Sequence, residues 1–195
     1  TQIRPSMITN VSLRATTTAV LSSDLATRQF LLDDAVPEAN GGAVWNGRGE
    51  LIGIISRDRP TDLARVLPAN NLIQAFQSLL TDRQIRHATL GVRTIDLSQV
   101  AFDDDRAPTH VGLWVNTLQP TIPALVPQGP ASKALQEGDV ILRIERDLLD
   151  GRADLGERLL DYRPGSAVTI YGTRKGNPFQ ALVTLGTAMT SEILK

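Results

Sequence analysis

Two short apolar runs on either side of a glycine-containing turn constrain the fold of this chain most. The runs are Ala43–Trp45 and Leu51–Ile55, and Asn46-Gly47-Arg48-Gly49-Glu50 lies between them. Asn and Gly tolerate positive φ, so this spacing predicts a β-hairpin. Similar short runs rich in Val, Ile, Leu and Thr, bounded by Gly, Pro and Asn, recur along the chain and predict a mainly β fold with a few helices. These further strand segments are Thr9–Val20, Gln29–Leu32, Thr89–Ile95, Gly112–Val115, Val140–Ile144, Ala167–Tyr171 and Phe179–Leu185.

One segment has helical spacing instead. Apolar residues at 72, 73, 76, 79 and 80 follow an α-helical period, and Asn70 or Asn71 is a suitable cap. We expect this stripe to pack in a core or between domains. Ala131–Leu135 and Arg152–Tyr162 are shorter helix predictions. The polar segment from Asp82 to His87 predicts a boundary, giving domains at 1–85 and 86–189 and a tail at 190–195.

Composition excludes several classes of function. The formal net charge of −1 gives no basic field for nucleic acid. The absence of cysteine excludes disulfides, thiolate metal sites and a cysteine nucleophile. No apolar run approaches the roughly 20 residues of a membrane span. Asp103-Asp104-Asp105 lacks the spacing of a calcium loop, so we expect no metal or cofactor. Because the sequence begins at Thr1 without Met or a signal pattern, we expect it to be part of a longer protein.

The region from about Met7 to Leu80 resembles the C-terminal barrel half of HtrA-type, trypsin-like serine proteases. The motifs that carry the resemblance are Asp34-Ala35, Gly41-Gly42-Ala43, Gly49-Glu50-Leu51-Ile52-Gly53-Ile54 and Leu67-Pro68-Ala69-Asn70, in the family's order. The resemblance implies half of a chymotrypsin-like β-barrel, with the nucleophile loop at Asp34–Val44.

The departures from this family fall where the chemistry would be. The glycine that donates an oxyanion N–H aligns with Glu38, and the nucleophilic serine aligns with Asn40, ahead of Gly41 and Gly42. An oxyanion site needs preorganised donors and no nearby negative charge. An amide is a very poor nucleophile. We therefore expect no active catalytic residue here, with Glu38 and Asn40 as degenerate positions. Asn40-Gly41 alone also predicts a tight turn, with or without protease ancestry.

The other members of a catalytic triad are also missing. In the resembling family the histidine and aspartate precede the serine, but no histidine precedes Asn40. The two histidines, His87 and His110, both follow it. A trypsin-type triad therefore cannot form within this chain in the family's order.

The region from about His87 to Gly186 resembles a bacterial PDZ domain of the kind that follows HtrA protease domains. The matching motifs, in family order, are Leu90-Gly91-Val92, Gly112-Leu113-Trp114-Val115, Gly129-Pro130-Ala131, Glu137-Gly138-Asp139-Val140-Ile141, Asp154-Leu155 and Pro164-Gly165-Ser166-Ala167-Val168. The resemblance implies a partly open β-barrel with two helices.

A PDZ domain binds a peptide or protein C-terminus by adding it as a strand to a sheet edge, and a glycine-containing loop of backbone N–H groups holds the carboxylate. By this resemblance Thr89, Leu90, Gly91 and Val92 form the carboxylate loop. Arg93 to Ile95 form the pairing edge, so Arg93 and Ile95 belong to the site. The second helix lines the pocket with Ala153, Glu157 and Leu160. The alternative is that Leu90 and Val92 are core residues behind a closed groove.

Three functions stay open at this stage. The first is a catalytically inactive HtrA-like homologue whose PDZ module binds peptides. The second is a portion of a genuine endopeptidase whose His/Asp half lies upstream or on another chain. The third is a structural or assembly subunit, because a half-barrel leaves strand edges and apolar surface uncovered and favours a homo-oligomer or a covering partner. The family resemblance alone favours an extracytoplasmic location.

Overall fold

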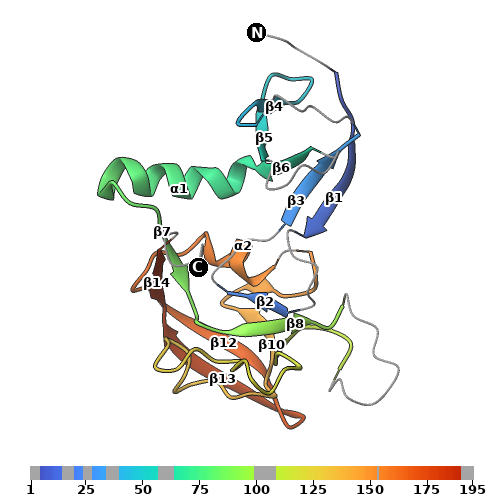
Figure 1. The fold of residues 1–195 in the computed structure, drawn as a ribbon. Helices are drawn as coiled ribbons and strands as arrows, with labels where there is room; N and C mark the ends of the chain where they lie inside the picture. Colours follow the sequence, from blue (N-terminus) through green and yellow to red (C-terminus); the bar gives the residue numbers. More distant parts are fainter. Residues whose placement is uncertain are drawn as a thin grey trace.

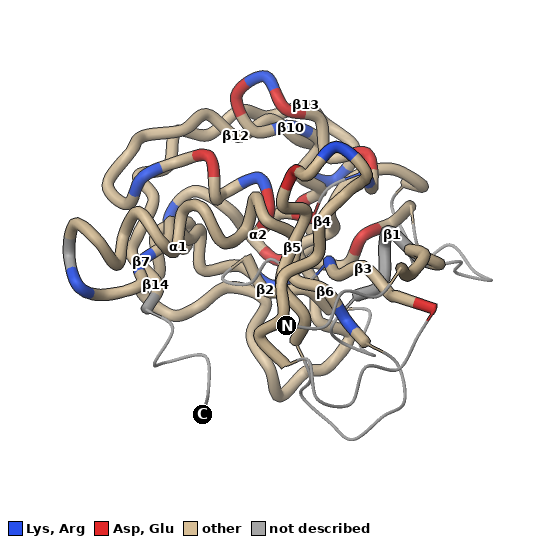
Figure 2. Tube along the Cα trace, turned by 90° about the horizontal axis from the view of Figure 1, so that it is seen from above, with Lys and Arg blue, Asp and Glu red and all other residues tan. Residues whose placement is uncertain are grey.

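The computed structural model describes residues 5–14, 20–23, 28–33, 40–56, 64–98, 109–152 and 154–189. Within these ranges the chain forms two main sheets, a two-stranded sheet and two helices (Figure 1). Glu38, Ala39 and Ala153, and the tail at 190–195, lie outside the described residues. Figure 2 shows basic and acidic residues interspersed along the trace, in keeping with the near-zero net charge.

The first sheet has five antiparallel strands in the spatial order β1-β3-β6-β5-β4. They are β1 (Ile8–Arg14), β3 (Arg28–Leu32), β4 (Ala43–Trp45), β5 (Leu51–Ser56) and β6 (Arg65–Pro68). β4 and β5 are the predicted hairpin, and its turn is closed by Asn46, which accepts from the Arg48 and Glu50 N–H groups at 2.9 and 3.0 Å. The buried core beneath this sheet is small: Leu32, Ile55, Ala64 and Val66.

The second sheet has seven strands, six of them in the order β13-β12-β10-β9-β8-β2, with β11 pairing β10. They are β2 (Val20–Ser22), β8 (Arg93–Asp96), β9 (Leu113–Val115), β10 (Val140–Ile144), β11 (Asp147–Leu148), β12 (Ala167–Arg174) and β13 (Asn177–Thr184). A larger apolar core packs against this sheet. It includes Leu90, Val92, Leu113, Ile141, Ile144, Leu155, Leu159 and Ile170. β7 (Arg86–Thr89) and β14 (Gly186–Met189) form the separate two-stranded sheet.

The long helix α1 (Ala69–Asp82) links the two main sheets. It starts directly after Pro68 of β6 and ends at Arg83, whose left-handed backbone (φ 56°) donates its N–H to the Leu79 carbonyl. The prediction that its apolar stripe packs in a core or between domains is wrong for Phe76 and Leu80, which are 61% and 69% exposed. Figure 1 shows that α1 extends sideways from the end of β6, between the two main sheets.

The short helix α2 (Leu155–Leu159) lies within the predicted segment Arg152–Tyr162. Asp154 accepts the Glu157 N–H at 2.7 Å, and the Glu157 carboxylate accepts the Asp154 N–H at 3.0 Å, which is a capping box. Ala131–Leu135 is not the helix predicted from the sequence. It is a run of turns in which the Ala131 carbonyl accepts from the N–H groups of Ala134 and Leu135.

β2 lies in the first half of the sequence but belongs to the second sheet. It precedes β3 in sequence, yet it pairs with β8 at the edge of the second sheet, whereas β1 and β3 lie in the first (Figure 1). No helix among the described residues is long and apolar enough to cross a membrane.

Candidate peptide groove

The loop that joins β7 to β8 holds the four residues predicted to bind a carboxylate. Gly91 adopts φ +66°, a left-handed conformation that favours glycine, and its N–H donates to Thr89 Oγ1 at 2.9 Å. A Cβ at this position would lie 3.1 Å from Pro130 Cδ. Leu90 and Val92 are buried in the apolar core. Their side chains anchor the loop, so any ligand contact from these residues must come from their backbone groups.

The predicted pairing edge, β8, has neighbours on both sides. β9 pairs with Thr94, Ile95 and Asp96. On the opposite side β2 pairs antiparallel, with Val20 opposite Ile95, Leu21 opposite Thr94 and Ser22 opposite Arg93. Strand addition needs a free edge. Here a segment of the same chain lies along that edge.

Ser23 follows β2 directly and lies against the predicted carboxylate loop. Its N–H donates to the Val92 carbonyl at 2.9 Å, and its hydroxyl accepts the Val92 N–H at 3.0 Å. The same hydroxyl lies 3.3 Å from Thr89 Oγ1. Ser23 is 1% exposed. Two of the loop's N–H groups, those of Gly91 and Val92, are therefore satisfied by hydroxyl oxygens.

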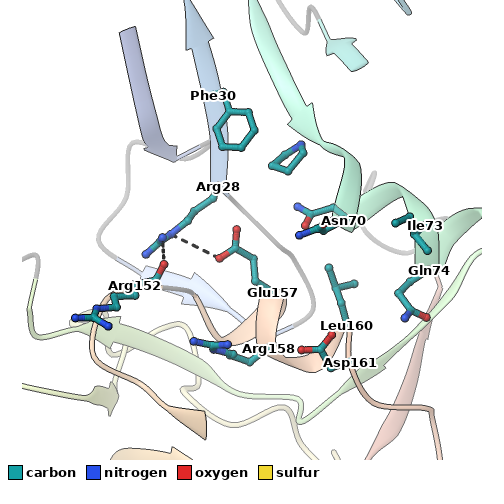
Figure 3. A pocket seen from close by; sticks show the side chains of 12 residues that line it. Arg28, Phe30, Asn70, Ile73, Gln74, Arg152, Glu157, Arg158, Leu160 and Asp161 are labelled. Atoms are coloured by element: carbon teal, nitrogen blue, oxygen red, sulfur yellow. Dashed lines mark hydrogen bonds and ion pairs between the residues drawn. The ribbon is translucent and has the colours of Figure 1, made fainter. Parts of the chain in front are cut away.

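The side chains predicted on the second helix face another cavity. Glu157 and Leu160 line a space of about 470 Å³ between α2 and α1, together with Ile73 and Gln74 of α1 (Figure 3). Arg93, on the predicted pairing edge, donates from its guanidinium to the Pro123 carbonyl at 2.8 Å. The structure thus brings Thr89 to Ile95 together along the loop and β8, and it places Glu157 and Leu160 at the α1 side of α2.

Arg28, the first residue of β3, ties the first sheet to the segment before α2. Its guanidinium donates to the carbonyls of Gly151 and Arg152. Its Nε lies 3.6 Å from Glu157 Oε2, an ion pair in which both side chains are largely buried (Figure 3). Burial raises the pKa of Glu157, and the Asp154 carboxylate adds to this, while Arg28 acts in the opposite direction.

Asn40, the predicted nucleophile position, is exposed on a turn. Asn40 precedes Gly41, which adopts φ +81° and donates its N–H to the Ile55 carbonyl at 2.9 Å. Gly42 accepts the Ile55 N–H at 2.8 Å. The glycine pair therefore holds this turn against β5. His87 lies on β7 and His110 precedes β9, so both are attached to the second half of the fold.

Sequence reasoning missed Leu21, Ser23 and Arg28. Each acts on residues far away in sequence, as Ser23 does on Val92. The predicted strand Thr9–Val20 ends one residue before Leu21, and no local pattern marked Ser23 or Arg28. In the described part of the chain, no cluster of three or more His, Asp or Glu side chains forms a metal site.

Comparison with known proteins places these features in context. The PDZ domain family matches residues 88–185. The serine protease Do-like HtrA of Lactococcus lactis subsp. cremoris is 29% identical over 163 residues, covering 76% of this chain and 39% of that protein. The periplasmic pH-dependent serine endoprotease DegQ of Escherichia coli is 26% identical over 157 residues, covering 78% and 33%. The chain thus spans less than two fifths of the length of these relatives.

Solved structures resemble the fold at lower sequence identity. An HtrA-type protease, AlgW, solved with a decapeptide, superposes with a TM-score of 0.58 at 22% identity, covering 84% of this chain and 50% of that one. The same protease with a tripeptide gives a TM-score of 0.55. At this identity the likeness concerns the fold.

Proposed function

Since the chain belongs to the PDZ domain family and is a homologue of HtrA-type serine proteases, we propose that it binds peptides or protein C-termini and does not itself cleave them. The observation that carries the proposal is the left-handed Gly91 loop leading into β8. A strand added at this edge would end at the loop's N–H groups, which is the PDZ mode of binding. In this proposal residues 86–189 are the PDZ domain, 1–85 the protease-like half-barrel with its linker helix, and 190–195 a tail.

The absence of cleavage follows from the residues present. Asn40 stands at the nucleophile position and offers an amide in place of a hydroxyl. Glu38, at the position of the oxyanion glycine, would bring a carboxylate to a site that must stabilise negative charge. Both histidines belong to the second half of the chain, so no base is supplied in the family's order.

Titration of the purified chain with fluorescein-labelled peptides that differ only at their C-terminal residues tests the binding proposal. We expect saturable anisotropy changes for peptides with apolar C-terminal segments, and weaker binding when the carboxylate is amidated. No saturable binding by any peptide of the panel would overturn the proposal.

A fluorogenic casein assay tests the absence of cleavage. The unmodified chain and Asn40→Ser should both be inactive, because restoring the hydroxyl supplies neither the base nor the oxyanion donor. Robust cleavage by the unmodified chain would favour the second function, a portion of an endopeptidase completed by a His/Asp half upstream or on another chain.

A structural or assembly role is a third proposal, supported by exposed apolar side chains. Trp45 is 60% exposed, and Phe76 and Leu80 on α1 are exposed to a similar degree. Such side chains favour a covering partner or self-association. Light scattering tests this: a concentration-dependent dimer or larger species supports it, and a strict monomer across micromolar concentrations opposes it. By analogy with periplasmic relatives such as DegQ, we also propose an extracytoplasmic location.

A further inference from the structure

We propose that Val20–Ser23 is a tethered ligand of the peptide groove, so that the resting chain occupies its own site and an incoming peptide must displace this strand. The inference rests on the proposed peptide-binding function. Three sets of contacts support it: the pairing of β2 with β8, the hydrogen bonds of Ser23 to the loop before β8, and the contacts of Arg28 with Gly151, Arg152 and Glu157.

The pairing matches the way a peptide would bind. β2 runs antiparallel to β8, with Val20 opposite Ile95 and Ser22 opposite Arg93, and α2 packs against it. This segment therefore lies beside both β8 and α2, the two elements between which strand addition places a ligand. Figure 1 shows β2 alongside β8, in the lower part of the molecule.

The end of the strand mimics the end of a peptide. A bound C-terminal residue would give its N–H to the loop and receive loop N–H groups on its carboxylate. The Ser23 N–H donates to the Val92 carbonyl, and the Ser23 hydroxyl accepts the Val92 N–H. The Ser23 hydroxyl thus accepts the Val92 N–H, which a peptide carboxylate would otherwise accept, although the chain continues past Ser23.

Burial along the segment alternates as it would for a ligand. Leu21 and Ser23 are 2% and 1% exposed, whereas Val20 and Ser22 are partly exposed. A strand presents every second side chain to the same face. The groove therefore holds an apolar side chain two residues before the residue at the loop. The same spacing defines the class of peptide that should compete best.

Arg28, five residues after Ser23 in the sequence, holds the chain on the other side of the tether. Its bonds to the Gly151 and Arg152 carbonyls and its ion pair with Glu157 fix the chain beside the start of α2. A short tether gives the strand an effective concentration on the order of millimolar or more. A peptide in solution binds only the fraction of molecules whose groove is open, so its apparent affinity falls by that fraction.

The test uses the chain's own strand as a probe. The probe is a labelled hexapeptide with the sequence of residues 18–23, Thr-Ala-Val-Leu-Ser-Ser, with a free carboxylate. Leu21→Asp in the protein should release the tethered strand, because it places a charge in a buried apolar position. We expect the probe to bind this variant about tenfold more tightly than the unmodified chain. Leu182→Asp makes the same change at a side chain that is 71% exposed on β13, and as the matched control it should leave the affinity unchanged.

Hydrogen exchange separates the failure of this inference from the failure of the proposed function. The Val92 amide, which donates to the Ser23 hydroxyl, should be protected in the unmodified chain and should exchange faster in Leu21→Asp. Equal, tight probe binding by both proteins, with equal exchange, would overturn the tethered strand and leave peptide binding intact. Absence of binding in both, with the exchange difference present, would overturn the proposed function and keep the strand in place.

Arg28→Gln provides a second variant that leaves Leu21 and β8 unchanged. Loss of its bonds to Gly151, Arg152 and Glu157 should loosen the tether and tighten probe binding by about threefold. An unchanged affinity in this folded variant would show that Arg28 does not hold the strand and would remove that part of the inference.

Discussion

Arg174 holds the buried carboxylate of Asp139 through two hydrogen bonds of 2.8 Å, from Nε to Oδ1 and from Nη2 to Oδ2. Asp139 is 1% exposed and also accepts the Gln136 N–H at 2.8 Å. Arg174 reaches the Ala134 carbonyl at 3.0 Å and lies over the Phe179 ring. One ion pair therefore joins the end of β12 to the turns that lead into β10.

Arg174→Ala should lower the free energy of unfolding by about 2 kcal/mol, because it leaves a buried carboxylate without its counter-ion. The partial exposure of Arg174 moderates the loss. Urea denaturation followed by circular dichroism measures it. Arg146→Ala removes an exposed arginine by the same chemical change and serves as the control, with an expected effect within about 0.5 kcal/mol. Equal losses in the two variants would contradict the role given to the pair.

Removal of the α2 cap should cost about 1 kcal/mol. Asp154→Ala deletes the oxygen that accepts the Glu157 N–H, and α2 has too few residues to tolerate an open first turn. Asp154→Ser restores an acceptor and should recover most of the stability. The comparison is made by urea denaturation, and Ala and Ser variants of equal stability would exclude the cap as the cause.

Glu157 should make stability depend on pH. Its pKa is raised in the folded chain, mainly by burial and then by Asp154, above its ordinary 4.5. The folded state therefore binds this proton more readily than the unfolded state does, and stability falls as pH rises from about 4.5 through the folded pKa. Glu157→Gln keeps an acceptor for the capping box but does not titrate.

The measurement for Glu157 is the free energy of unfolding at a series of pH values between 4 and 7. The stability of Glu157→Gln relative to the unmodified chain should increase with pH across this range. Two curves that stay parallel would show that the folded and unfolded pKa values are the same.

Gly53 in β5 has no room for a side chain. A Cβ there would lie 2.3 Å from the Leu67 carbonyl oxygen and 2.4 Å from Val66 Cγ1. Gly53→Ala should therefore cost about 3 kcal/mol. Gly47→Ala in the adjoining turn meets nothing within 4 Å and should change stability by less than about 0.5 kcal/mol. Fluorescence of Trp45 on β4, recorded in a Trp114→Phe background, reports this sheet, and equal midpoints would contradict the packing argument.

The features predicted correctly from the sequence are those with local signals. The mainly β class, the HtrA-type half-barrel resemblance and the PDZ module are confirmed by the fold and the comparisons. The Asn46–Glu50 hairpin and the helix over 72–80 follow from turn chemistry and apolar spacing. Such signals depend on residues a few positions apart, which a sequence displays directly.

The remaining features depend on contacts between distant residues. Nothing near Val20 indicates that it pairs with Ile95, and nothing near Arg28 indicates an ion pair with Glu157. The apolar spacing of α1 correctly predicted a helix, but spacing alone cannot say whether an apolar face is covered. The residue-by-residue assignment of the peptide site, from Thr89 to Leu160, remains a prediction.

β2 lies in the second sheet, apart from its sequence neighbours β1 and β3, and under the tethered-strand proposal this placement would couple the two sheets energetically. β2 completes the second sheet while β3, which follows it, begins in the first with Arg28. Consider a partner that binds the first sheet only while β2 is paired with β8. Such a partner would lower the affinity for peptide by some factor, and a bound peptide would lower the affinity for the partner by the same factor. The first sheet would then set the sensitivity of the peptide site.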